Sequence, residues 1–213
     1  MKLNKWHMII ASILFLVVGY FTSSTAIEIA STVSGLLCVW LAAKQNIWTY
    51  PIGFVNIVFF MIVFYDARLY ADFSLQIFFA VLSTYGWIYW LRNKGDQPVK
   101  ATQKTSAGLA IAMMALTIIG TALWGYVLHQ YTDASIPYAD AFIAILSVVA
   151  QILLSSKRLE NWYVWILVDV LSVGMYFYKG LHVIGILYIV FTINAIYGAI
   201  AWHKQYKEES VNV

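Results

Sequence analysis

The sequence predicts an all-α membrane protein with several transmembrane helices, and its composition and hydropathy carry this prediction. Of the 213 residues, 62% are hydrophobic and only 11% are charged, and the mean hydropathy is +0.76. Because about a quarter of the residues in a typical soluble domain are charged, a soluble fold of this length would be unusual. Long apolar runs in lipid must satisfy their own backbone hydrogen bonds, so helices are the expected structure for them.

Eight apolar runs have nearly the length, about 17–25 residues, that a helix needs to cross about 30 Å of hydrocarbon. They fall at 6–23, 27–43, 47–65, 70–91, 107–129, 140–156, 161–178 and 181–202. With eight spans and a cytoplasmic N-terminus, eleven of the 13 lysines and arginines lie on the inner side, and only Arg68 and Lys179 lie outside. This positive-inside bias predicts that both termini are cytoplasmic.

The first apolar run, 6–23, has two interpretations. Lys2 and Lys5 precede it and the small residues Ser24 and Ala26 follow it, a pattern that is also typical of a signal peptide. We expect the run to be retained as an extra transmembrane helix. Cleavage would leave seven helices that begin outside, with the rest of the topology unchanged.

The chain contains an internal repeat. At a shift of 113 residues, and of 112 after a one-residue gap, the matched pairs include Ser34 with Ser147, Lys44 with Lys157, Asn56 with Asp169, Tyr85-Gly86 with Tyr197-Gly198, and Trp90 with Trp202. The repeat predicts three helices over 27–91, one linking helix over 107–129 and three more over 140–202. Because a single span links them, both triplets enter the membrane from the same side, as in SWEET-type transporters.

The predicted fold class is therefore an all-α polytopic membrane protein with a SWEET-like 3+1+3 parallel repeat and one additional N-terminal transmembrane helix. The expected organisation is the N-terminal helix (1–26), the first three-helix repeat (27–92), a cytoplasmic loop with the linker helix and an outer loop (93–139), the second repeat (140–203) and a cytoplasmic tail (204–213).

The segment ENWYVWILVD, residues 160–169, places a carboxylate near the middle of a span. Trp162, Trp165 and Asp169 are spaced i, i+3 and i+7, so they share one helical face. A charge at the bilayer centre costs at least ~2.5–3.5 kcal/mol, so it normally faces a protein interior or a wet cavity. Aromatic faces beside a carboxylate predict a site for a flat, cationic or amino-bearing ring. The alternative is a protonated packing residue, hydrogen-bonded to Asn56 or Ser172.

Other polar residues inside the spans are candidates for the same site. Repeat transporters bind substrate near the midplane between their repeats, which predicts that Asn56, the repeat equivalent of Asp169, contributes to binding. Gln76, Asn194 and Tyr197 are further substrate-binding candidates. For these residues the alternative is helix packing, including hydrogen bonds between helices.

No catalytic or metal site is expected. Asp169 is the only acidic residue at depth, whereas intramembrane aspartyl proteases need two carboxylates, and all four histidines lie near span ends. The sequence has no GxxxxGK[ST] phosphate loop and no cluster of metal ligands, and the single cysteine, Cys38, supports no disulfide. The scattered basic residues do not indicate nucleic-acid binding. A membrane sensor or an intramembrane enzyme is the alternative from another class.

Two stretches, NWYVWILVDVLSV followed by YKGL and LYADFSLQIFFAVLSTYGWIYW, resemble the PnuC family of bacterial vitamin transporters. The resemblance covers about 27–202. It implies a SWEET-like fold, facilitated diffusion across the bacterial inner membrane and trapping of the vitamin by a cytosolic kinase, with no cofactor. It also places the family motif W-x-x-W-x-x-x-[N/D] on Trp162, Trp165 and Asp169. A homo-oligomer is left open.

The last motif position bears on the substrate. Nicotinamide riboside importers of this family resemble one another in having asparagine there, where this sequence has Asp169. An asparagine donates and accepts hydrogen bonds, which suits a carboxamide, whereas a carboxylate only accepts and pairs better with an aminopyrimidine or a thiazolium. We therefore expect thiamine, as in the thiamine-type PnuT branch, with nicotinamide riboside as the alternative.

Overall fold

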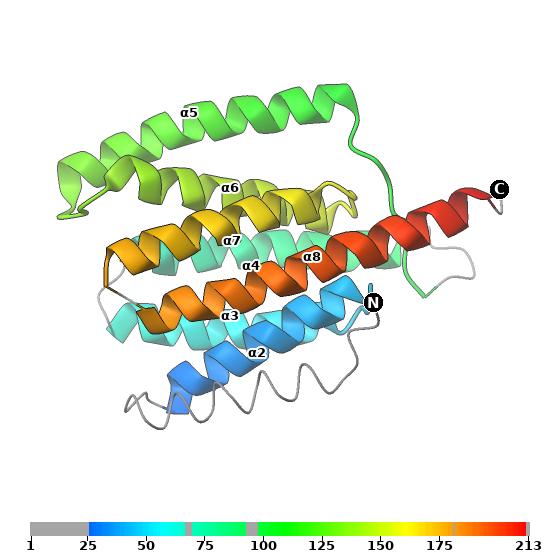
Figure 1. The fold of residues 1–213 in the computed structure, drawn as a ribbon, viewed down its shortest axis with the longest axis horizontal. Helices are drawn as coiled ribbons and strands as arrows, with labels where there is room; N and C mark the ends of the chain where they lie inside the picture. The colour runs from blue at the N-terminus through cyan, green and yellow to red at the C-terminus, as the bar shows by residue number, and fades with distance from the viewer. Residues whose placement is uncertain (1–25, 67–69, 93–97, 181, 212–213) are drawn as a thin grey trace.

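The structure, a computed structural model, describes residues 26–66, 70–92, 98–180 and 182–211, and this part of the chain is a bundle of helices (Figure 1). In chain order the helices are α2 (Ala26–Ala43), α3 (Thr49–Asp66), α4 (Tyr70–Leu91), α5 (Ala107–Tyr131), α6 (Pro137–Ser155), α7 (Asn161–Tyr178) and α8 (His182–Val211). The predicted all-helical architecture is confirmed for these residues. The predicted first span, 6–23, lies outside them.

The helix ends follow from local sequence signals. The helix α6 begins at Pro137, three residues before the predicted span, because proline is favoured in the first helical turn, where its missing N–H is not needed. Before α5, the Ser106 side chain accepts a hydrogen bond from the Leu109 N–H. The helix α8 continues past the predicted end at 202 to Val211, because the mostly polar residues after Trp202 extend the helix, and among them Lys204 and Glu208 are exposed and form an ion pair.

The lengths of the helices suit a bilayer. Within the described residues, three helices are long and apolar enough to cross a membrane by length and composition, namely Ala107–Tyr131, Pro137–Ser155 and Gly185–Glu208. The helices α2, α3 and α7 each have 18 residues. A helix of that length measures about 27 Å, close to the thickness of the hydrocarbon core.

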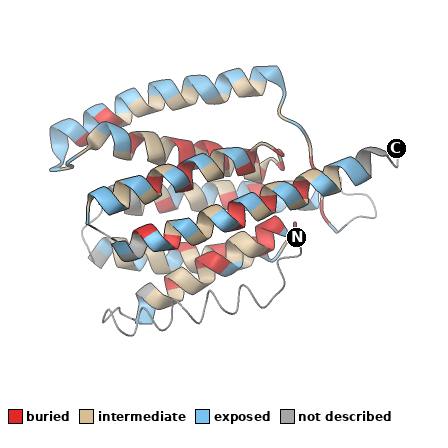
Figure 2. Cartoon of the chain, viewed as in Figure 1, coloured by how far each residue is buried: buried red, intermediate tan, exposed pale blue. Residues whose placement is uncertain are grey.

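Six of the helices close into a ring, and α5 lies outside it (Figure 1). Around the ring, α2 packs on α3, α3 on α4, α4 on α6, α6 on α7, α7 on α8, and α8 on α2, whereas α5 packs on α6. The contacts of α2, α3 and α4 correspond one to one to those of α6, α7 and α8, so each triplet has the same arrangement and each triplet's last helix packs on the first helix of the other. Figure 2 shows that α5 is mostly exposed, whereas buried residues gather on the ring helices.

The largest buried cluster lies at one end of the ring, which we call the Lys157 end. Here α2, α4 and α6 end, and α3 and α7 begin. The cluster consists of Ala42, Ala43, Tyr50, Trp90, Val99, Leu159, Trp162, Ala195 and Trp202. Residues 98–106, which precede α5, lie along this same end (Figure 1).

Candidate functional site

The predicted stripe on α7 faces the interior of the bundle. Trp162 and Asp169 are 2% and 5% exposed, and Ser172, one turn beyond Asp169, is fully buried. Trp165 is half-buried. The spacing of these residues therefore describes a real buried face of the helix. Asp169 is eight residues from the start of α7, which puts it about 12 Å along an 18-residue helix, close to its middle.

The packing of α7 against α8 sets the level of Asn194 relative to Asp169. A Cβ atom on Gly198 would lie 2.6 Å from ring atoms of Trp162, so these two residues are in contact. Because α7 and α8 are antiparallel, a step forward along α7 corresponds to a step back along α8. Seven residues after Trp162 is Asp169, and seven residues before Gly198 is Phe191, so Asp169 and Phe191 lie at about the same level. Asn194 is less than one turn from Phe191, so it lies at about the level of Asp169.

Asn56 on α3 lies at the same level, on the other side of α2. A Cβ atom on Gly35 of α2 would be 3.2 Å from Asn56 Nδ2 and 3.6 Å from Phe191 Cζ. The absence of a side chain at Gly35 thus lets α3 and α8 approach the same point of α2. The repeat predicted that Asn56 and Asp169 would lie at similar depth, and this packing agrees with it.

We call Asn56, Asp169, Ser172 and Asn194 the middle layer, and most of its polar atoms lack a protein partner. Within the described part of the chain, Ser172 Oγ and Asn194 Nδ2 are buried without a hydrogen bond. The Asp169 carboxylate likewise has no hydrogen bond or ion pair with a described residue. Buried polar groups in proteins are normally paired, so a carboxylate, a hydroxyl and an amide that are unpaired at one level make this layer the candidate site for a polar ligand.

Asn56 differs from the rest of the layer because its amide is engaged. Asn56 Nδ2 donates to the Ser31 carbonyl oxygen at 2.6 Å and to Ser34 Oγ at 3.0 Å, both on α2. The packing alternative for Asp169 required a hydrogen bond to Asn56 or Ser172. Among the described residues neither bond is present, so nothing within them satisfies the buried carboxylate.

The remaining predicted residues lie on both sides of the middle layer. Trp162 belongs to the buried cluster at the Lys157 end, and Trp165 and Tyr197 pack against that cluster. Gln76 on α4 is 7% exposed. Tyr50 on α3 contacts Gly86 on α4. Because these helices are antiparallel, moving six residues along each from that contact brings Asn56 opposite residue 80. Gln76 is four residues beyond residue 80, so it lies about 6 Å farther than Asn56 from the Lys157 end.

Ser172 was not among the predicted site residues. Its signal was present in the sequence, since it lies three residues after Asp169 and extends the same helical face. A serine inside a helix normally donates to a backbone carbonyl one turn earlier, as Ser34 and Ser147 do. Only the structure shows that Ser172 does not.

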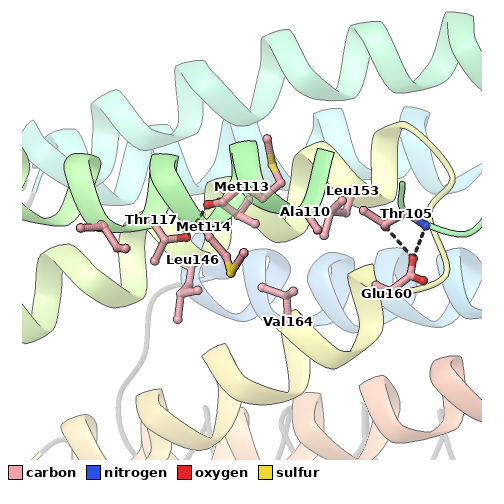
Figure 3. A pocket seen from close by; sticks show the side chains of 11 residues that line it. Thr105, Ala110, Met113, Met114, Thr117, Leu146, Leu153, Glu160 and Val164 are labelled. Atoms are coloured by element: carbon pink, nitrogen blue, oxygen red, sulfur yellow. Dashed lines mark hydrogen bonds between the residues drawn. The ribbon is translucent and has the colours of Figure 1, made fainter. Parts of the chain in front are cut away.

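A separate apolar groove of about 490 Å³ lies between α5, α6 and α7 (Figure 3). None of the predicted site residues lines it. Its carboxylate, Glu160, is occupied, because Glu160 Oε2 accepts hydrogen bonds from the Thr105 N–H at 2.9 Å and from Thr105 Oγ1 at 2.6 Å. The groove therefore lacks the free polar groups that the middle layer has.

The described part of the chain does not suggest a metal centre. Among the described residues, no three His, Cys, Asp or Glu side chains lie close enough together to bind a metal ion. The chemistry available at the middle layer is a carboxylate, a hydroxyl and two amides, with aromatic rings on the side of the Lys157 end. That set recognises a polar, flat organic molecule.

Comparisons with known proteins identify the family to which this chain is similar. The family described as "Nicotinamide mononucleotide transporter" matches residues 25–204. The nicotinamide riboside transporter PnuC of Escherichia coli (strain K12) is 29% identical over 210 residues, which cover 85% of this chain and 87% of that relative. The riboflavin/roseoflavin transporter RibM of Streptomyces davaonensis is 25% identical over 189 residues, covering 86% of this chain and 87% of the relative.

The fold has a close counterpart among solved structures. The crystal structure of the vitamin B3 transporter PnuC aligns with a TM-score of 0.77 and 24% sequence identity, and the alignment covers 94% of this chain and 90% of that chain. At this identity the likeness shows a shared fold.

Proposed function

The chain belongs to the nicotinamide mononucleotide transporter family, which includes PnuC, and from this premise we propose that it carries its vitamin through the middle layer. It is a multi-pass membrane protein and a vitamin transporter, not an enzyme. The predicted membership of the PnuC family is confirmed. The assignment to the thiamine-type branch has no support from the relatives reported above, which are described as transporters of nicotinamide riboside and riboflavin.

The substrate that we propose is nicotinamide riboside. Its pyridinium ring is cationic, and a carboxylate without a protein partner at Asp169 would stabilise that charge. Its carboxamide oxygen accepts hydrogen bonds, which the unpaired Ser172 Oγ and Asn194 Nδ2 would donate. The observation that carries the proposal is this grouping of one free carboxylate and two free donors at one level of a membrane bundle.

Riboflavin and thiamine are the other two vitamins whose polar groups could pair with Asp169. Riboflavin is the second candidate, because one relative is described as its transporter and its imide N–H would donate to Asp169. Thiamine, which Asp169 favours in the sequence, has an amino group and a cationic ring for the same carboxylate. The names of the relatives support nicotinamide riboside over thiamine, so we propose the reverse of the order expected from the motif alone.

The phosphorylated form of the riboside is a poorer fit. The middle layer, as defined, contains a carboxylate and no lysine or arginine. A phosphate ester would bring a second negative charge into a low-dielectric site, where repulsion is strong. We therefore propose that the protein binds the riboside in preference to the mononucleotide.

We further propose that transport proceeds by alternating access between two parallel three-helix repeats. The exchange symmetry of the helix contacts supports this repeat. The excess of basic residues supports a cytoplasmic position for the Lys157 end and for both termini. Residence in the bacterial inner membrane, facilitated diffusion and trapping by a cytosolic vitamin kinase complete the proposal. Trp162, Trp165, Gln76 and Tyr197 stay predicted substrate contacts.

The test is calorimetric binding of nicotinamide riboside, nicotinamide mononucleotide, riboflavin and thiamine to the purified protein. Nicotinamide riboside is expected to bind most tightly, and the mononucleotide at least about tenfold more weakly, equivalent to about 1.4 kcal/mol. Tightest binding of thiamine would restore the substrate predicted from the motif. Failure of all four ligands to bind would overturn the proposed site.

The variant Asp169→Asn separates the two cationic vitamins. It removes the negative charge that both cationic rings use, but it keeps a side chain that can pair with the carboxamide of nicotinamide riboside, a group that thiamine lacks. Nicotinamide riboside affinity should fall by less than thiamine affinity. Equal losses for both ligands would show that charge alone governs the site.

A further inference from the structure

Lys157 is a buried cation at the end of the bundle, in the turn between α6 and α7. The residue is 1% exposed. Its Nζ atom lies 4.8 Å from the ring centroid of Trp90 and 5.9 Å from that of Trp202, and it donates a hydrogen bond to the Lys100 carbonyl oxygen. A lysine is almost never fully buried without such compensation. These contacts therefore hold Lys157 in place between two aromatic rings.

The two tryptophans join the two helix triplets by matching hydrogen bonds. Trp90 on α4 donates from Nε1 to the Leu154 carbonyl oxygen on α6, at 3.1 Å. Trp202 on α8 donates from Nε1 to the Ala42 carbonyl oxygen on α2, at 3.0 Å. Their ring centroids are 5.7 Å apart. Each indole thus spans from one triplet to the end of a helix in the other, and Lys157 contacts both rings.

The segment that contains Lys100 and Gln103 forms backbone hydrogen bonds with this cluster. The Lys100 N–H donates to the Trp90 carbonyl oxygen at 2.7 Å, and the Gln103 N–H donates to the Lys157 carbonyl oxygen at 3.0 Å. The Leu159 N–H donates back to the Gln103 carbonyl oxygen at 2.9 Å. Lys157 itself has a φ of 54°, which costs energy for a residue other than glycine and persists only where surrounding contacts fix it.

We propose that Lys157, Trp90 and Trp202 form a closed gate, the Lys157 gate, which must part before substrate can leave the middle layer at this end. The assignment to substrate release rests on the proposed function. Rocking of one triplet against the other separates Trp90 from Leu154 and Trp202 from Ala42, and it exposes the Lys157 ammonium to water. The gate is closed by interactions between the triplets, and hydration of the ammonium offsets part of the cost of opening.

Trp162 connects the gate to the substrate site. Its ring meets that of Trp202 edge-on, with centroids 5.7 Å apart and an interplanar angle of 80°. It is also two turns from Asp169 on the same face of α7. A ligand bound at Asp169 and stacked towards Trp162 would press on a ring that supports the gate, so binding and opening are coupled through this side chain.

The repeat supplies a matched control for Lys157. Lys44, which the sequence repeat pairs with Lys157, occupies the turn between α2 and α3, is exposed, and lies over the single ring of Trp40 at 4.4 Å. The structure corrects this pairing by one residue, because Gln45 has the φ of 53° and the turn hydrogen bond that match those of Lys157. Replacing Lys44 by methionine removes the same charge from the same kind of turn. It does not remove a cation from between the two triplets.

The test measures access to the middle layer from each side of the membrane. Ser172→Cys is introduced with Cys38→Ser, and its modification by a membrane-impermeant quaternary-ammonium methanethiosulfonate is timed in right-side-out and inside-out vesicles. Lys157→Met should raise the rate from the cytoplasmic side about tenfold, equivalent to about 1.4 kcal/mol of gate closure. The rate from the outer side should not rise. Lys44→Met should change neither rate, and Lys157→Arg should stay close to the parent.

An unchanged cytoplasmic rate in correctly inserted Lys157→Met would overturn the gate, as would an equal rise with Lys44→Met. If Lys157→Met does not insert, Trp90→Phe and Trp202→Phe make the same test, since each removes one bond between the triplets. No cytoplasmic increase in either would also reject the gate. Protection of the cysteine by nicotinamide riboside reports on the proposed function separately. A rate change without protection would keep the gate and remove the substrate assignment.

Discussion

The Lys157, Trp90 and Trp202 side chains at one end of the bundle and most of the polar side chains of the middle layer are buried, but the two groups differ in whether they have hydrogen-bond partners. At the Lys157 end, the ammonium of Lys157 and the indoles of Trp90 and Trp202 have partners in the protein. In the middle layer, the donors of Ser172 and Asn194 have none among the described residues. The Lys157 end also contains buried atoms without a hydrogen bond, such as Tyr50 OH and Trp162 Nε1. The contrast is therefore between the paired Lys157, Trp90 and Trp202 side chains and the unpaired groups that lie together at the level of Asp169.

This difference separates structural polar residues from functional ones. A partnered buried group contributes to stability, and its loss leaves another group unsatisfied. An unpartnered group costs free energy in the empty protein, so its loss should affect ligand affinity and leave stability nearly unchanged. Measuring both quantities for one variant therefore assigns its residue to one class or the other.

The largest effect is expected for Asp169→Ala. Nicotinamide riboside affinity should fall about 100-fold, equivalent to about 2.7 kcal/mol, because a charge-assisted interaction is lost. The thermal unfolding midpoint in detergent should not fall, since the carboxylate has no described partner and its burial is costly. Strong destabilisation with unchanged affinity would instead make Asp169 a packing residue.

Asn56→Ala tests a residue that belongs to both classes. Two hydrogen bonds to α2 are lost, which should lower stability by about 1–2 kcal/mol. Affinity should fall about tenfold, equivalent to about 1.4 kcal/mol, because Asn56 lies at the level of Asp169. Titration calorimetry and thermal unfolding of the same preparation check both effects. Full affinity would place Asn56 outside the site.

Ser172→Ala should show a smaller effect confined to binding. Loss of one neutral donor should weaken binding about fivefold, close to 1 kcal/mol. Stability should change by less than about 0.5 kcal/mol, because Ser172 Oγ makes no hydrogen bond within the described structure. Ser147→Ala is the matched control, since Ser147 Oγ bonds the Ile143 carbonyl oxygen in the same kind of helix. An affinity loss as large for Ser147→Ala would cancel the assignment of Ser172.

The smallest effect is expected for Asp140→Asn, at the opposite end of α6 and α7 from Lys157. Both carboxylate oxygens of Asp140 accept hydrogen bonds from Lys179 Nζ, at 2.7 and 2.9 Å. The pair is partly exposed, so its loss should cost at most about 1 kcal/mol of stability. Affinity measured by calorimetry should not change. A clear affinity loss would show that partnered groups also govern binding.

Much of the fold was predictable because bilayer thickness restricts the sequence strongly. Apolar runs such as 70–91 and 161–178 coincide with α4 and α7. The end of α8 was not predictable from hydropathy, because mostly polar turns after Trp202 continue the helix. The placement of α5 outside the ring was also not predictable, because an apolar helix has the same composition whether it faces lipid or protein.

The site was predictable only as far as helical periodicity reaches. The spacing of Trp162, Trp165 and Asp169 predicted their shared face, and the repeat predicted Asn56 at a similar level. The sequence did not show that Asn56 donates to α2, or that Ser172 lacks a bond, because those depend on the close approach of neighbouring helices. The match of Trp90 with Trp202 was visible, yet their bonds across the triplets required the structure.

The most direct test of the vitamin carrier is counterflow in proteoliposomes preloaded with unlabelled nicotinamide riboside. The wild-type protein should accumulate labelled riboside from outside without ATP or an ion gradient. Asp169→Ala, reconstituted to the same density, should accumulate almost none. Exchange by Asp169→Ala at the wild-type rate, or no exchange by a wild-type protein that binds the riboside, would contradict a carrier that works through the middle layer.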